Sequence, residues 1–214
     1  DDSLSGDGEA DTLNGGEGWD TMSGGDGNDS LITGTGGFHD IHGGNGNDTL
    51  DTASSTQALA IMDDGNDLAI GGNGIDAFYG MAGNDSLVGA NGDDRLYGGN
   101  GNDTLDGGNG DDHLNSDIGN DSLTGGAGTD DIYSGEGNDT VDAGTGNDSI
   151  TDVGDNDLLY GGEGNDTVQA GNGVDTVTYA DATGAISFNI GLGTVTGSAG
   201  ADTLSSVQNA IGSS

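Results

Sequence analysis

A nine-residue repeat runs through most of the 214-residue chain and limits the folds that the chain can adopt. The unit is Gly-Gly-x-Gly-x-Asp-x-U-x, where U is apolar, and GGNGNDTLD (98–106) is one copy. His39 and Gln57 take the aspartate position in two units, which makes 20 successive units. The sixth-position aspartates are Asp2, Asp11, Asp20, Asp29, Asp48, Asp67, Asp76, Asp85, Asp94, Asp103, Asp112, Asp121, Asp130, Asp139, Asp148, Asp157, Asp166 and Asp175. A fixed period of this kind predicts a stacked, solenoid-like architecture.

Composition alone would favour disorder, because the chain has 48 glycines, 29% hydrophobic residues and a formal net charge of −38. One Lys or Arg against 39 acids excludes nucleic acid and anionic membrane surfaces as expected partners. With no cysteine, there is neither a disulfide framework nor a thiolate metal site. No apolar run is long enough for a membrane span. A start Met and a signal peptide are also lacking, so we expect a piece of a longer protein.

Each unit is expected to form a turn of six residues followed by a strand of three. Glycine permits the positive φ angles of tight turns, and alternation along a strand sends the U residue inward. Two units then form one coil of 18 residues with a strand on each side, and stacked coils build two parallel sheets around a thin core. The predicted inward column is Leu4, Leu13, Met22, Leu31, Ile41, Leu50, Leu59, Ala69, Phe78, Leu87, Leu96, Leu105, Leu114, Leu123, Ile132, Val141, Ile150, Leu159, Val168 and Val177.

So thin a core and so much negative charge indicate that a cation holds the fold together. Calcium accepts six to eight oxygen ligands in flexible geometry, which suits aspartates and exposed turn carbonyls. Magnesium retains its waters, and zinc prefers the nitrogen and sulfur ligands that this chain barely offers. We therefore expect folding to be coupled to calcium binding.

In GGEGWDTM (15–22), GGDGNDSL (24–31) and GGNGNDTL (43–50) the chain resembles the RTX, or haemolysin-type, calcium-binding repeat family. The resemblance implies an all-β fold, a right-handed parallel β-roll with two nonapeptide units per coil. It also implies that each ion lies between turns one coil apart, bound by two sixth-position aspartates and by carbonyls of the first four positions. The implied side-chain ligands are Asp11, Asp20, Asp29, Asp48, Asp67, Asp76, Asp85, Asp94, Asp103, Asp112, Asp121, Asp130, Asp139, Asp148, Asp157, Asp166 and Asp175. The implied carbonyl ligands include Gly71, Gly72, Asn73, Gly74, Gly98, Gly99, Asn100, Gly101, Gly107, Gly108, Asn109 and Gly110.

The sequence sets an upper bound on the number of ions. Twenty units contain 18 neighbouring pairs on the same edge, and three of those pairs involve His39 or Gln57, which leaves 15. Up to about 15 Ca²⁺ ions would reduce the charge of −38 to about −8.

The register changes in two places. Same-edge spacing rises from 18 to 19 residues, which predicts one-residue insertions near 31–34 and near 60–62. We expect one edge to lose its ions around His39 and Gln57, and the other to be continuous from Asp11 to Asp175. His39 and His42 either bind a transition metal or are simply solvated or packed in a loop.

Composition changes after Thr178, which divides the chain into a repeat region (1–178) and a metal-poor β capping segment (179–214). Gly184 and Gly193 occupy aspartate positions, and Ile186, Phe188 and Ile190 alternate as one longer strand followed by Leu192 and Val195. One further repeat, GSAGADTLS, follows at 197–205.

Function is expected to be structural, because the aspartate pairs recur along the whole chain whereas catalytic pairs are normally single. The first hypothesis is a calcium-dependent spacer, stiffener or adhesin segment of a secreted or cell-surface protein. The alternative is an accessory, secretion-assisting module of a secreted enzyme or toxin. The family resemblance implies type I secretion, with folding outside the cell. Neighbouring repeat modules or surface glycans are candidate partners, since Tyr79, Tyr97 and Tyr133 share an outward column that either binds a ligand or stacks across strands.

Overall fold

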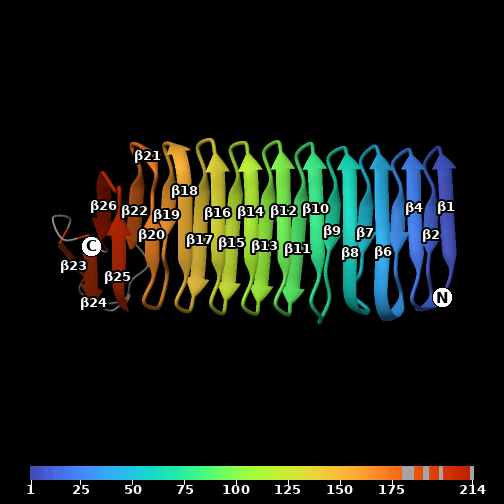
Figure 1. Ribbon diagram of the computed structural model, residues 1–214, viewed down its shortest axis with the longest axis horizontal. Coiled ribbons are helices and arrows are strands. Elements are labelled where there is room, and N and C mark those ends of the chain that lie inside the picture. The colour runs from blue at the N-terminus through green and yellow to red at the C-terminus, as the bar shows by residue number, and fades with distance from the viewer. Residues whose placement is uncertain (180–185, 190–192, 198–199, 213–214) are drawn as a thin grey trace.

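The computed structural model describes residues 1–179, 186–189, 193–197 and 200–212. Within these ranges every regular element is a β-strand. The strands are stacked side by side along one long axis, with the N-terminus at one end of the stack (Figure 1). No helix in the described part of the chain has the length and apolarity that a membrane crossing requires.

The first of two sheets contains 15 strands, and those on its main path up to β25 pair in parallel. In spatial order the path is β1 (Ser3–Gly8), β4 (Thr21–Asp26), β6 (Thr35–Asn45), β8 (Ser55–Asp64), β10 (Ala77–Ala82), β12 (Arg95–Asn100), β14 (His113–Ile118), β16 (Asp131–Glu136), β18 (Ser149–Asp155), β20 (Thr167–Gln169), β25 (Gly200–Ser205), β24 (Thr194–Gly197) and β23 (Ile186–Asn189). Two short strands lie off this path: β3 (Glu17–Gly18) pairs with β6, and β21 (Asn172–Gly173) pairs with β18.

The second sheet contains 11 parallel strands. They are β2 (Thr12–Asn14), β5 (Ser30–Ile32), β7 (Thr49–Asp51), β9 (Leu68–Ile70), β11 (Ser86–Asn91), β13 (Thr104–Asn109), β15 (Ser122–Ala127), β17 (Thr140–Thr145), β19 (Leu158–Tyr160), β22 (Thr176–Tyr179) and β26 (Asn209–Gly212).

Along the chain the strands alternate between the two sheets, so that each coil places one strand in each. Leu105 pairs with Leu87 on one side and with Leu123 on the other, a shift of 18 residues in each direction. This shift equals two nine-residue units. The predicted all-β solenoid of stacked coils is therefore confirmed, and its arrangement is that of a parallel β-roll.

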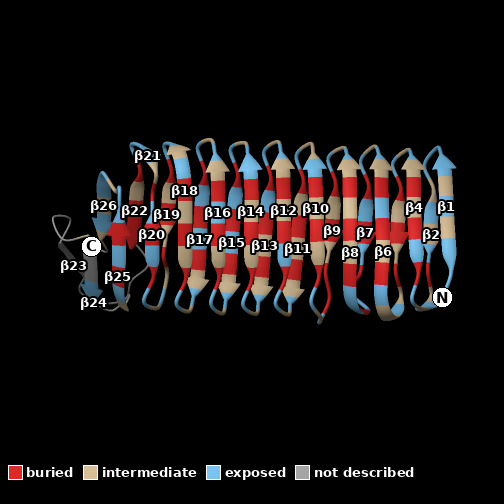
Figure 2. Cartoon of the chain, viewed as in Figure 1, coloured by how far each residue is buried: buried red, intermediate tan, exposed pale blue. Residues whose placement is uncertain are grey.

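The core is a single file of apolar side chains between the sheets. From Met22 to Val177 nearly the whole predicted inward column is buried, and Leu4 and Leu13 are only partly buried at the first coil. Figure 2 shows the buried segments as bands that recur from strand to strand along the stack. Because most strands contribute only one or two apolar side chains, the core stays thin along its whole length.

Most turns have glycine at their fourth position and many have it at their second, although Asp63, Met81, Ala90 and Asp117 adopt positive φ at the second position without it. Gly99 and Gly101 have φ angles of +108° and +141°, which L side chains rarely adopt. A Cβ at Gly101 would also collide with the carbonyl oxygen of Gly83 in the preceding coil. The repeat thus keeps glycine where the backbone turns back and where adjacent turns come closest.

The register differs from the sequence prediction around residue 57. Ala58, rather than Gln57, pairs with His39, and the Ala58 amide donates a hydrogen bond to Asp76. Gln57 is exposed, and Ala60 takes the core position that was predicted for Leu59.

The second insertion consequently lies between Asp48 and Ala58, and its predicted position near 60–62 is wrong. The physical reason is the glycine-free stretch 52–57, where a local turn accommodates the extra residue. The amide and hydroxyl of Ser55 both donate to the carbonyl of Thr52, at 2.8 and 2.9 Å, and close that turn.

The first insertion lies between Gly36 and His39 rather than near 31–34, because Gly18 pairs with Gly36 while the amide of Asp20 donates to His39.

At the C-terminal end, β25 pairs with β20 and β26 pairs with β22, so the parallel stack continues past residue 200. Strands β23, β24 and β25 form an antiparallel meander beside it. Gly193 does not follow Asp175 in the aspartate column as predicted, because Gln208 takes that place. In the other column Asp202 lies one coil after Asp166. Gly184, Ile190 and Leu192 lie outside the described residues. The division at 178/179 stays a prediction.

Candidate metal centre

Two ladders of aspartates run along the stack, one at the start of each sheet's strands. In each ladder the backbone amide of one aspartate donates a hydrogen bond to Oδ1 of the aspartate one coil later. Sixteen such bonds occur among the described residues, with distances of 2.7–3.2 Å. The side chains are thereby held in one orientation from coil to coil.

The first ladder precedes the strands of the 15-stranded sheet, and the second precedes those of the 11-stranded sheet. The first contains Asp2, Asp20, His39, Ala58, Asp76, Asp94, Asp112, Asp130, Asp148, Asp166 and Asp202. The second contains Asp11, Asp29, Asp48, Asp67, Asp85, Asp103, Asp121, Asp139, Asp157, Asp175 and Gln208.

The second carboxylate oxygen of most ladder aspartates is buried and accepts no hydrogen bond. Such atoms are costly unless a charge or a donor meets them. They are Oδ2 of Asp20, Asp29, Asp48, Asp67, Asp85, Asp94, Asp103, Asp112, Asp121, Asp130, Asp139, Asp148, Asp157, Asp166 and Asp175. Asp11 is only half-buried, and Oδ2 of Asp76 instead accepts from the amide of Gly72 at 2.9 Å.

Glycine at the first position of a turn leaves a hollow beside nine of these oxygens. In the other six turns that position is occupied by Met62, Ser116, Ser134, Ala143, Asp152 and Ala170. A Cβ placed on Gly107 would lie 2.5 Å from Oδ2 of Asp112 and 2.7 Å from the carbonyl oxygen of Gly125, one coil later. A carboxylate and a backbone carbonyl therefore border the same small space, and any side chain would fill it. Hard oxygen ligands around such a space fit Ca²⁺.

Burial makes the ladder carboxylates poor anions when no cation is near. Burial raises the pKa of Asp103 and Asp112 to about 7, although the amide hydrogen bond to each one lowers it. Neighbouring ladder aspartates raise these pKa values further. Asp157 reaches a pKa of about 8, again chiefly through burial. A divalent cation between the turns would remove both the burial penalty and the mutual repulsion.

The predicted carbonyl ligands are in two different situations. The carbonyls of Asn100 and Asn109 accept from the amides of Gly83 and Gly92 in the preceding coil, at 2.9 and 2.8 Å. Gly98 and Gly107 direct their carbonyls toward the hollows of the coil before them. In the turn of residues 71–74 the amide of Gly72 binds Asp76, so this turn closes on its own aspartate. Coordination by Gly71, Asn73, Gly74, Gly99, Gly101, Gly108 and Gly110 stays a prediction.

The first ladder is interrupted at His39 and Ala58, whereas the second runs on from Asp11 to Asp175 without a break. The amide of Asp20 lies 3.3 Å from Nδ1 of His39, which replaces a carboxylate oxygen, and Ala58 offers no side-chain ligand. His39 is fully buried, while His42 is exposed and lies 3.9 Å from Asp63. The structure does not bring the two histidines to one site.

Sequence reasoning missed two members of the ladders. Asp202 accepts from the amide of Asp166 at 3.0 Å, and Gln208 accepts from the amide of Asp175 at 3.0 Å. The repeat at 197–205 contained the signal for Asp202, but an excursion of 36 residues separates it from its ladder neighbour. Gln208 carries no motif that could have identified it.

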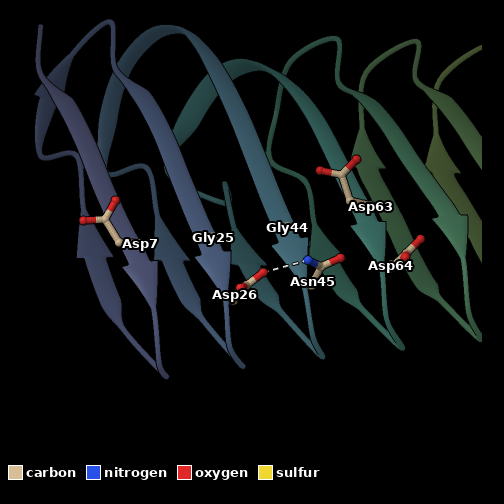
Figure 3. Close-up of a pocket in the computed structure, with 7 residues that line it drawn as sticks. All are labelled: Asp7, Gly25, Asp26, Gly44, Asn45, Asp63 and Asp64. Carbon is tan, nitrogen blue, oxygen red and sulfur yellow. Dashed lines mark hydrogen bonds between the residues drawn. The ribbon is translucent and has the colours of Figure 1, made fainter.

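A second set of acids lies on the outside of the turns near the N-terminus. They line an open depression of about 520 Å³, shown in Figure 3. Its lining residues are Asp7, Gly25, Asp26, Gly44, Asn45, Asp63 and Asp64. Asn45 donates to Asp26 at 2.7 Å (Figure 3). Asp7, Asp26 and Asp64 are exposed and Asp63 is half-buried, unlike the buried aspartates of the ladders.

The outward tyrosines stack on one another. The rings of Tyr79 and Tyr97 are 4.7 Å apart and nearly parallel. His113 lies between Tyr97 and Tyr133, with ring centroids 5.7 and 5.5 Å away. Of the two interpretations of this tyrosine column, ligand binding or cross-strand stacking, stacking is confirmed for Tyr79 and Tyr97. Their facing rings are used in this contact.

Comparison with known families agrees with this geometry. A family model described as the RTX calcium-binding nonapeptide repeat (4 copies) matches residues 1–31, 32–54, 63–96, 88–123, 106–141, 116–150 and 142–177. No curated protein matches the chain. Together the matches span most of the chain and coincide with the turns that carry the ladders. The chain therefore belongs to the RTX calcium-binding nonapeptide repeat family, and it is a calcium-binding repeat module folded as a β-solenoid.

Proposed function

We propose that this chain is a calcium-dependent structural module of a secreted or cell-surface protein, where it acts as a spacer, stiffener or adhesin segment. The observation that carries the proposal is the row of buried, unpartnered Oδ2 atoms along both ladders. They recur in nearly every coil, so each coil's stability depends on a cation. Because solenoid coils contact only their neighbours, loss of cations would loosen the whole stack.

In this proposal the ions lie between successive ladder aspartates and take further oxygens from the turns. Each Asp-to-Asp step is one candidate gap. The structure adds the Asp166–Asp202 step to the 15 expected from the sequence, which gives 16 steps as an upper bound. His39 and Ala58 leave the first ladder with fewer sites than the second.

A non-catalytic role is supported by the repetition itself. The carboxylate pairs recur with the same hydrogen bonds from coil to coil, whereas a catalytic pair needs one environment that sets two different pKa values. The depression near Asp7 and Asp63 is open and lined mainly by solvated acids and glycines. Residues 179–214, in the same proposal, cap the roll, with Asp202 as an added ladder member.

Folding outside the cell follows if the calcium affinity is modest. Extracellular calcium modules bind with dissociation constants of about 10⁻⁴–10⁻³ M. At cytosolic calcium the repelling ladders would keep the chain expanded and competent for export, and at extracellular calcium the stack would form.

The test is a calcium titration of the full chain followed by small-angle X-ray scattering. We expect an expanded coil below micromolar calcium and a rod above about 1 mM, with one cooperative midpoint between them. A midpoint below micromolar calcium would contradict folding outside the cell. A compact rod in the presence of chelator would overturn the structural role proposed for the ions.

A further inference from the structure

One turn of the second ladder carries an acid where the repeat has glycine. Asp152 occupies the first position of the turn 152–157, the position that leaves the hollow in other turns. Its side chain is not turned out to solvent, since Asp152 is only 4% exposed. In the same column, 18 and 36 residues earlier, Ser134 and Ser116 are also buried. This column therefore places polar side chains where glycine elsewhere leaves space.

Asp152 lies beside two ladder aspartates. One carboxylate oxygen from each of Asp139, Asp152 and Asp157 lies within 4.8 Å of the other two, and all three residues are buried. This limit is about twice a Ca–O distance of 2.4 Å, so any two of these oxygens are close enough to share one ion, and small side-chain movements bring in the third.

The hydrogen bonds leave the same oxygen available on each residue. Oδ1 of Asp139 accepts from the amide of Asp121, and Oδ1 of Asp157 accepts from the amide of Asp139, both at 2.8 Å. Oδ1 of Asp152 accepts from the hydroxyl of Ser134 at 2.8 Å. Oδ2 of all three is buried and accepts no hydrogen bond.

The backbone departs from its regular pairing to admit this acid. Between β16 and β18 the register shifts at Gly135, so that Asp152 pairs with Gly135 and Gly154 with Glu136. Val153 is pushed outward and is 55% exposed. A bulge of this kind re-aims side chains, and here it accompanies a carboxylate pointing into the stack.

The gap between Asp139 and Asp157 carries more negative charge than the other gaps between ladder aspartates. A ladder aspartate lies between two successive gaps, so its charge is shared by both. Asp152 is not a ladder member and adds a full negative charge to one gap. Three buried carboxylates this close repel one another strongly, and the two donors on Asp152, the Ser134 hydroxyl and the Val153 amide, do not offset that repulsion.

We propose that Asp139, Asp152 and Asp157 form a three-carboxylate cation site that binds Ca²⁺ more tightly than the other gaps do. In the folded chain it is the last site to empty into a chelator. Its extra charge also gives it a preference for trivalent lanthanide ions over the two-carboxylate gaps. The inference rests on the proposed function, because Asp139 and Asp157 are also ladder ligands.

The test compares calcium binding by the full chain and by three variants, using isothermal titration calorimetry and terbium luminescence. Asp152→Asn keeps the shape and removes the charge, and Asp152→Gly restores the residue that the repeat has at this position. Ser134→Ala is the matched control, because it removes the hydrogen bond to Asp152 and keeps the carboxylate. Circular dichroism at saturating calcium checks that each variant folds. If Asp152→Asn does not fold, the comparison of Asp152→Gly with the wild-type chain tests the inference.

We expect one ion to bind the wild-type chain at least about tenfold more tightly than the other ions do. A tenfold difference is about what one additional charge-assisted contact contributes. Both Asp152 variants should lose this class and its terbium preference, and Ser134→Ala should retain it. A wild-type chain with a single uniform class of sites, or Asp152 variants that keep the tight ion, would overturn the inference while leaving the proposed function intact. A chain that binds no calcium at all would overturn both.

Discussion

Replacing Asp103 by Asn should change the stability of the chain in opposite directions with and without calcium. Asp103 is 2% exposed in the middle of the second ladder. Its Oδ1 accepts from the amide of Asp85, and its own amide donates to Asp121. An Asn side chain keeps the acceptor and nearly the same volume, so the substitution removes mainly the charge.

The magnitudes follow from burial and from ligand loss. With a pKa of about 7 against an ordinary 3.8, ionised Asp103 disfavours the ion-free fold by about 4 kcal/mol above neutral pH. Asp103→Asn should recover up to that amount in chelator. In calcium, the variant loses a charged ligand from the gaps on both sides of residue 103. Each affected ion should then bind with about 1.5–3 kcal/mol less free energy, or roughly 10–150-fold more weakly.

The assay is a calcium titration monitored by circular dichroism, with urea unfolding at both ends of the titration. Asp106→Asn is the matched control, since Asp106 follows in the same repeat but lies half-exposed on β13, outside the ladder. The control should leave the calcium midpoint nearly unchanged. If Asp103→Asn and Asp106→Asn shift the midpoint equally, general charge reduction explains the effect and the ladder is not the ligand set.

Three further outcomes are expected. Burial raises the folded-state pKa of Asp112 to about 7, so protonation of Asp112 favours the ion-free fold. In chelator, the β-structure measured by circular dichroism should therefore be greatest below about pH 4 and should fall as the pH rises through about 7. In calcium the trend reverses, since protons compete for the same oxygens, and calorimetry should show tighter binding as the pH rises over that range. Gly107→Ala should weaken calcium-dependent folding, because the added Cβ would collide with Asp112 and Gly125. Gly154→Ala should leave folding unchanged, because the nearest atom to its Cβ is 3.7 Å away. The melting temperature in calcium should fall for the first variant and not for the second.

Much of the fold was predictable because one period fixes turn, strand and core together. The 18-residue shift between paired strands, the inward column and the ladder aspartates all follow from nine residues. The prediction was wrong where the period is locally absent. Between Asp48 and Ala58 no glycine marks the turn, so alignment by spacing assigned Gln57 to the ladder, while packing buries Ala58.

The candidate site shows the same limit. The nine-residue spacing identified the ladder aspartates, because each one occupies the sixth position of its repeat unit. It could not assign Asp202, whose place depends on how a long excursion returns to the stack. Nor could it single out Asp152, since only the coil-to-coil packing brings that acid next to Asp139 and Asp157. Contacts between coils, rather than pattern within one unit, determine these features.

If calcium is part of the folded structure, far-UV circular dichroism of one sample, first in chelator and then in millimolar calcium, will show it. We expect a disordered spectrum in chelator at neutral pH and a β-sheet spectrum after calcium is added, reversible on renewed chelation. A β-sheet spectrum that is the same in chelator and in calcium would contradict this expectation.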